Sequence, residues 1–153
     1  MKHPICALVS AIALCAAVGL AHAHAQATPA GLWKTIGDDT GTERSLVRIT
    51  EAGGVFSGRI EKLLDPAIKA DAVCLKCSDE RKDKPLVGMT IIRGVSRNAS
   101  HHDTWDGGEI LDPNNGKTYA VRLKPADDGK TLAVRGYLGT PLLGRSQTWI
   151  RVE

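Results

Sequence analysis

The segment Gly31-Leu32-Trp33-Lys34-Thr35-Ile36 decides the fold that this sequence predicts, because it is the first stretch with the character of a β-strand. The last stretch of this kind is Gln147-Thr148-Trp149-Ile150-Arg151-Val152. If the sheet closes on itself, these two segments must lie side by side. Trp33 would then meet Arg151 in a cation–π contact that closes the fold, with Arg145 as the alternative partner.

Between these two ends, apolar and polar residues repeatedly alternate with the period of two that is typical of β-strands. The alternation and the turn residues predict six further strands, at residues 45–50, 55–64, 86–95, 104–111, 119–123 and 132–137. Their mostly short antiparallel connections favour an all-β, eight-stranded antiparallel up-and-down barrel over a two-sheet sandwich of similar strands. Closure would also remove the exposed edges that an open sheet has to protect.

The first 25 residues have the pattern of a secretory signal peptide. Lys2 and His3 are polar, residues 5–20 form an apolar run, and an A-x-A cleavage pattern ends at Ala25. This apolar run is shorter than the ~20 residues that span a bilayer, so we expect no membrane-spanning segment. Cleavage near Ala25 would leave residues 26–153 as a single domain in the periplasm or outside the cell.

Charge and motif content exclude several classes of function. The net charge is +3, and no block of like charges occurs, which gives no support to nucleic acid binding. The sequence contains no G-x-S-x-G motif and no phosphate-binding glycine loop. We therefore expect a protein that is not an enzyme and that needs no cofactor.

The pair Cys74-Leu75-Lys76-Cys77 is the sharpest chemical feature, and it lies within a charged segment at residues 65–84. Such a pair can be a structural disulfide, a redox dithiol or half of a zinc site. A redox dithiol is usually found at a helix N-terminus, whereas this chain offers a loop among strands. Zinc would need two more ligands, and the adjacent His101 and His102 point apart on an extended backbone. In an exported protein we expect a disulfide and no metal.

A barrel of eight strands can be filled by its own side chains or can hold one small ligand. The ligand hypothesis places five side chains on the cavity wall and two leucines as an apolar lid at the mouth. The wall residues are Phe56, Tyr119, Val121, Leu132 and Val134, and the lid residues are Leu142 and Leu143. The alternative is that these residues form ordinary core and surface packing.

Several motifs occur in an order that resembles a known family. They are Gly31-Leu32-Trp33, Lys62-Leu63-Leu64-Asp65-Pro66, Cys74-x-x-Cys77, Trp105-Asp106-Gly107-Gly108-x-Ile110-Leu111-Asp112-Pro113, Asn115-Gly116-Lys117-Thr118-Tyr119, Val134-Arg135-Gly136-Tyr137 and Pro141-Leu142-x-Gly144-Arg145-x-Gln147-Thr148-Trp149. Across residues 31–152 the chain resembles the bacterial exported family called domain of unknown function 2147. The resemblance implies a lipocalin-like barrel that can contain a ligand cavity, and it brings no established reaction or catalytic residues.

Together these features predict an exported protein that binds a small apolar or amphipathic molecule without covalent chemistry. One alternative is an envelope redox protein that acts through Cys74 and Cys77. Another is an interaction protein with a solid barrel, whose cysteine loop or Leu142-Leu143 loop contacts a partner. The identity of the ligand and the oligomeric state are not predicted by the sequence.

Overall fold

The computed structural model describes residues 27–38 and 40–153, and these residues form β-strands, turns and loops without a helix. The signal peptide expected at residues 1–25 lies outside the described residues. The strands are β1 (Gly31–Ile36), β2 (Glu43–Ala52), β3 (Val55–Leu63), β4 (Thr90–Arg97), β5 (Trp105–Asp112), β6 (Lys117–Pro125), β7 (Thr131–Tyr137) and β8 (Gly144–Arg151).

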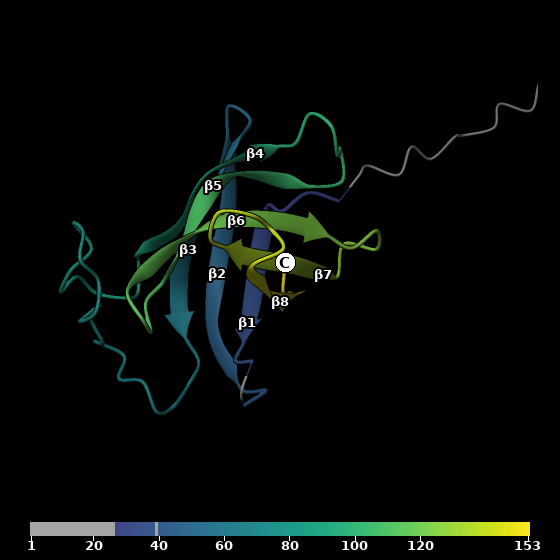
Figure 1. Cartoon of the computed structure of the whole chain (residues 1–153). Helices are drawn as coiled ribbons and strands as arrows, with labels where there is room; N and C mark the ends of the chain where they lie inside the picture. Colours follow the sequence, from purple (N-terminus) through teal and green to yellow (C-terminus); the bar gives the residue numbers. More distant parts are fainter. Residues whose placement is uncertain (1–26, 39) are drawn as a thin grey trace, which may run out of the picture.

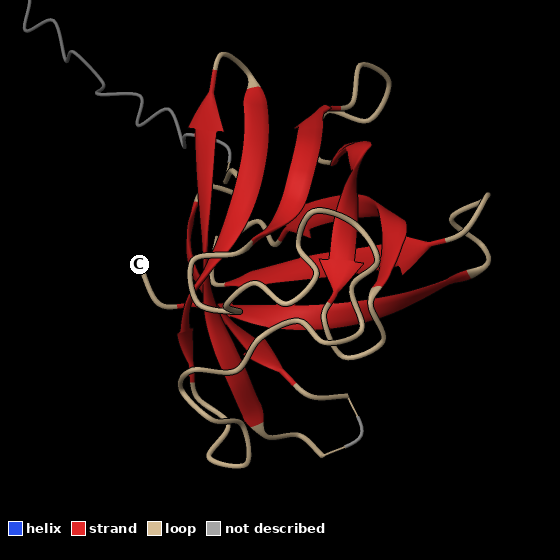
Figure 2. Ribbon diagram, turned by 90° about the vertical axis from the view of Figure 1, so that its left-hand side faces the viewer, coloured by secondary structure: helices blue, strands red, loops and turns tan. Residues whose placement is uncertain are grey.

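Each strand pairs antiparallel with the next one in the chain, and β8 pairs with β1 to close the barrel. At the closing seam Trp33 lies opposite Arg151, and Lys34 lies opposite Ile150. Figures 1 and 2 show the eight strands wrapped around one interior, with a long loop beside the end of β3. The all-β, eight-stranded up-and-down barrel predicted from the sequence is confirmed.

The fourth strand differs from the prediction, because β4 begins at Thr90 and not at residue 86. The apolar residues just before it hydrogen-bond to other partners: Leu86 N–H donates to Ala72 O, and Gly88 N–H donates to Ile60 O. These residues end the long connection between β3 and β4, which we call the disulfide loop (residues 64–89). Alternation predicts a strand here because Leu86 and Met89 are apolar and at least half-buried, although their backbone does not pair as a strand.

The barrel has two different ends. The connections β1–β2, β3–β4, β5–β6 and β7–β8 gather at one end, which we call the open end. The other three connections and both ends of the described chain gather at the opposite end, which we call the sealed end. The interior is closely packed by apolar side chains, among them Trp33, Val47, Ile49, Phe56, Val95, Trp105, Val121, Leu123 and Leu132.

Arg151 holds the sealed end together. Its guanidinium carbon lies 4.1 Å from the centroid of the fully buried Trp33 ring. The same guanidinium donates hydrogen bonds to the carbonyl oxygens of Thr28 (2.9 Å), Ala30 (2.8 Å) and Gly129. One side chain therefore joins the first described residues, the β6–β7 turn and the last strand.

Gly31 makes this contact geometrically feasible. Its φ is +142°, a conformation that L side chains rarely adopt, and a Cβ atom there would lie 2.3 Å from Arg151 Nη1. Trp33 completes the arrangement by donating its indole N–H to Pro29 O at 2.7 Å. The Gly-x-Trp motif thus provides both the space and the aromatic face that Arg151 occupies.

Candidate functional site

A cavity of about 820 Å³ opens at the open end of the barrel. Its apolar lining includes Ile60, Ile91, Ile110, Leu111, Val134 and Trp149. Polar residues from the strand ends and connections also line it, and we call them the rim: Thr35, Asp38, Thr40, Arg44, Ser45, Asp112, Asn114, Asn115, Tyr119, Arg145 and Gln147. The site thus offers apolar surface together with a set of hydrogen-bonding groups.

Gly136 contributes to the space inside. It is the second-last residue of β7, near the open end, and it lines the cavity. The nearest atoms to a Cβ built there are Tyr119 Cβ at 3.6 Å and Ile110 Cγ2 at 3.7 Å, which are ordinary contact distances. A larger side chain at this position would occupy cavity volume without meeting the backbone.

On one side of the rim, hydrogen bonds connect the mouth to the interior. Arg145 forms an ion pair with Asp38. The Gln147 amide donates to the same carboxylate at 2.9 Å and accepts a 3.1 Å hydrogen bond from the Trp149 indole N–H. The position of the buried Trp149 ring is therefore linked to the β1–β2 connection.

On the other side of the rim, Arg44 reaches from the start of β2 to the β5–β6 turn. Its Nη2 donates to Asn114 Oδ1 at 3.1 Å, and its Nη1 lies 3.7 Å from Asp65 Oδ2. In the same turn Asn115 Nδ2 donates to the Tyr119 hydroxyl at 3.0 Å. The amides of Asn114 and Asn115 in this turn, together with the phenol of Tyr119 on β6, therefore lie at the mouth.

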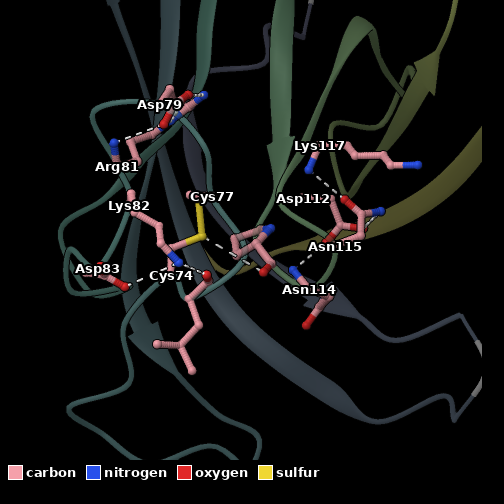
Figure 3. The surroundings of a disulfide bond; sticks show 12 residues. Cys74, Cys77, Asp79, Arg81, Lys82, Asp83, Asp112, Asn114, Asn115 and Lys117 are labelled. Atoms are coloured by element: carbon pink, nitrogen blue, oxygen red, sulfur yellow. Dashed lines mark hydrogen bonds and ion pairs between the residues drawn. A yellow bond between two sulfur atoms is a disulfide. The ribbon is translucent and has the colours of Figure 1, made fainter.

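The disulfide loop supports that turn from outside the cavity. Cys74 and Cys77 form a disulfide, and their exposed fractions are 1% and 2%. Gly116, with φ of +72°, packs so closely on this loop that a Cβ atom would lie 1.9 Å from Lys76 O. Figure 3 shows the two sulfur atoms facing the turn, where Cys74 Sγ lies 4.0 Å from Pro113 O.

This burial bears on the two other interpretations of the cysteines. A redox partner would have to reach sulfur atoms that are almost completely covered. Among residues 27–38 and 40–153, no group of three or more His, Cys, Asp and Glu side chains is arranged to hold a metal ion. The two cysteines are bonded to each other and buried.

Arg81 fixes the same loop to the barrel wall. Only 5% of Arg81 is exposed, and its guanidinium donates to Asp79 Oδ2 (3.0 Å), Thr90 O (3.3 Å) and Thr118 Oγ1 (3.3 Å). The side-chain and backbone hydrogen bonds from Arg81 lower the pKa of Asp79 to about 2. The hydrogen bonds from Arg81 to Thr90 and Thr118 thus join the disulfide loop to β4 and β6.

The structure divides the predicted ligand-binding residues into two groups. Tyr119 and Val134 line the cavity, together with Leu142 and Leu143 at its mouth. The two leucines are 89% and 75% exposed and lie at one edge of the mouth. The others, Phe56, Val121 and Leu132, lie in the packed core and not on the cavity surface.

Sequence reasoning missed the residues that give the cavity its character. Arg44 and Trp149 both line it, and neither was predicted to do so. For Gly136 a signal was present, since it continues the inward alternation of Leu132 and Val134 but has no side chain to fill the barrel. No comparable signal marks Arg44, whose contact with Asn114 joins residues 70 positions apart.

Three comparisons relate the chain to known proteins. The model of the family described as "uncharacterized protein conserved in bacteria (DUF2147)" matches residues 31–151. No curated protein matches the sequence. A solved structure that matches is protein HP1028 from the human pathogen Helicobacter pylori, which is described as belonging to the lipocalin family. The two chains are 18% identical, the match covers 83% of this chain and 84% of that one, and the TM-score is 0.71.

The likeness to HP1028 therefore shows a lipocalin-like fold. No helix in the described part of the chain has the length and apolar character needed to cross a membrane.

Proposed function

The chain belongs to the bacterial family DUF2147, and we propose that it is an exported, non-enzymatic protein that binds a small apolar or amphipathic molecule in its barrel. The observation that carries this proposal is the cavity at the open end. Its volume falls within the range of roughly 300–1,000 Å³ that is usual for small-molecule sites, and such sites combine apolar walls with a few placed polar groups.

Four of the residues predicted from the sequence belong to the proposed binding surface: Tyr119, Val134, Leu142 and Leu143. Phe56, Val121 and Leu132 contribute as the packed core of the same barrel. The lipocalin-like fold supports this function, since in that fold a closed sheet commonly holds one small ligand.

Two features support export to the periplasm or beyond the cell. The first 25 residues have the pattern of a cleaved signal. The Cys74–Cys77 disulfide is compatible with an oxidising compartment, where such bonds form and persist.

The decisive experiment measures whether a neutral apolar probe enters the cavity. We expect N-phenyl-naphthylamine to bind saturably and to change the fluorescence of Trp149, which lines the cavity. Gly136→Leu should weaken this binding at least about tenfold, because the new side chain takes up cavity volume. Ala133→Leu is the matched control, since Ala133 lies exposed on the same strand.

Saturable binding to the native protein and to Ala133→Leu, with loss in Gly136→Leu, would support the proposal. Absence of saturable binding by the native protein, or equal binding by all three proteins, would overturn it. Thermal unfolding of each variant checks that the barrel is intact.

A further inference from the structure

We propose that Arg44 binds the anionic head group of an amphipathic ligand, a carboxylate or phosphate whose apolar chain lies in the cavity. This inference rests on the proposed function and names the ligand class. Its basis is the placement of a guanidinium in the polar rim of a cavity whose inner wall is apolar. A simple apolar ligand would leave that cation without a role in recognition.

The local structure holds Arg44 at the rim. A Cβ atom at Gly37 would lie 3.2 Å from Arg44 Cδ, so the arginine stem packs against this glycine of the β1–β2 connection. The guanidinium then extends to Asn114 in the β5–β6 turn, although β2 is not a neighbour of β5 or β6 in the sheet. Arg44 therefore joins two separate parts of the mouth and remains 31% exposed there.

The hydrogen bonds of Arg44 leave capacity for a ligand. A guanidinium carries five N–H donors in a fixed planar fork. In the described structure the guanidinium of Arg44 forms one hydrogen bond, to the neutral amide oxygen of Asn114. Asp65 forms an ion pair with Arg44 at 3.7 Å, beyond hydrogen-bond distance, and it is not part of the cavity lining, so the N–H donors that face the mouth stay available to a ligand.

The other charged groups of the lining already have partners. Arg145, the second cation, forms an ion pair with Asp38, which also accepts from Gln147. The carboxylate of Asp112 accepts hydrogen bonds from the Asn114 N–H and from Asn115 Nδ2, both at 2.9 Å. Among the described lining residues, Arg44 is therefore the charged group best placed to receive an anion.

Carboxylates and phosphates match a guanidinium because two parallel N–H···O bonds can form at once. The bond is stronger when the site excludes water, and the apolar chain of the ligand would do so by filling the cavity. An amphipathic anion thus uses both halves of the site, with its chain against residues such as Trp149 and its head at Arg44.

The experiment compares ligands of one chain length with different heads. Calorimetry on the full mature chain would measure dodecanoate, dodecyl phosphate, dodecanol and dodecylamine, each below the concentration at which it forms micelles. We expect the two anions to bind about tenfold more tightly than dodecanol, and dodecylamine to bind no better than dodecanol. Acetate and inorganic phosphate at the same concentration should not displace dodecanoate, because a free anion lacks the chain.

Arg44→Gln should remove the preference for anions, so that dodecanoate and dodecyl phosphate bind no more tightly than dodecanol does to the same variant. The matched control is Arg59→Gln, since Arg59 is exposed on β3 and does not line the cavity. Asn114→Asp is a second variant, which places a carboxylate beside Arg44 and should weaken dodecanoate binding more than dodecanol binding. It tests the same idea if Arg44→Gln folds poorly.

The outcomes separate the two proposals. Equal binding of all four amphiphiles, or an anion preference that survives in both Arg44→Gln and Asn114→Asp, would overturn the role of Arg44 and leave the cavity function intact. Displacement of dodecanoate by acetate or inorganic phosphate would overturn the amphipathic class. No binding of any amphiphile, together with no binding of the neutral dye, would overturn the cavity function itself.

Discussion

The two ends of the barrel each present an arginine, and the arginines are used differently. At the sealed end, Arg151 lies on the Trp33 ring and donates to four carbonyl oxygens. At the open end, the guanidinium of Arg44 forms one hydrogen bond, to Asn114. The surrounding structure accepts hydrogen bonds from most N–H groups of Arg151, whereas most N–H groups of Arg44 remain available. The contrast shows that the number of local partners distinguishes a structural arginine from one suited to recognition.

The sharpest test of this contrast is to truncate both arginines. Arg151→Ala should lower the free energy of unfolding by about 3 kcal/mol, because it removes the cation–π contact with the buried Trp33 ring and leaves the part-buried carbonyl oxygens of Ala30 and Gly129 without this donor. Arg44→Ala should cost less than about 1 kcal/mol, as expected for a partly exposed ion pair. Denaturant unfolding of both variants measures the difference, and equal losses would remove the distinction between the two ends.

A smaller effect is expected from the disulfide that supports the open end. Replacing both Cys74 and Cys77 with serine should lower the free energy of unfolding by about 2 kcal/mol, since the bond closes a very short loop. The variant should also bind the neutral dye more weakly, because the β5–β6 turn packs on this loop through Gly116. Unchanged dye affinity in a folded variant would show that the loop does not support the mouth.

The smallest effect concerns the acid dependence of the disulfide loop. Hydrogen bonds from Arg81 lower the pKa of Asp79 from 3.8 to about 2. The folded state therefore gains stability from this group above pH 3.8 and loses it progressively as the pH falls towards 2. As the pH falls from 3.8 to 2, amide hydrogen exchange in residues 64–89 of the native protein should become faster than expected from its rate above pH 3.8, once the intrinsic pH dependence of exchange is subtracted.

Asp79→Asn serves as the comparison for that measurement, because the amide cannot titrate. Its exchange rates should lack the step between pH 3.8 and 2, and the Trp33 region of both proteins should be unaffected. An identical step in Asp79→Asn would assign the acid response to another group.

The sequence predicted the barrel, and physical reasons explain why it did not predict the shape of the cavity. Alternation identifies which side chains point inward, and Phe56, Leu132 and Val134 all satisfy it. It does not give their height along the barrel axis, which depends on the stagger between strands. Only Val134 of these three lies high enough towards the open end to line the cavity.

Closure at Trp33 and Arg151 was predictable for a different reason. A glycine, an aromatic ring and a cation on the two terminal strands form a self-sufficient contact that needs no knowledge of the stagger. No sequence pattern marks the contact between Arg44 and Asn114 in the same way. Asn114 lies in the β5–β6 turn, whose sequence predicts the shape of the backbone but not which distant side chain it contacts.

Both ends of the described chain lie at the sealed end, where Arg151 contacts Thr28 and the Leu32 N–H donates to Glu153 O. A tag, an immobilisation surface or a fused reporter attached after residue 153 would therefore sit at the pole opposite the mouth. Biosensor formats that tether the protein by its C-terminus should leave ligand entry unobstructed. A short peptide joining residues 153 and 27 would give a circular permutant whose new termini can be placed in any of the mouth loops.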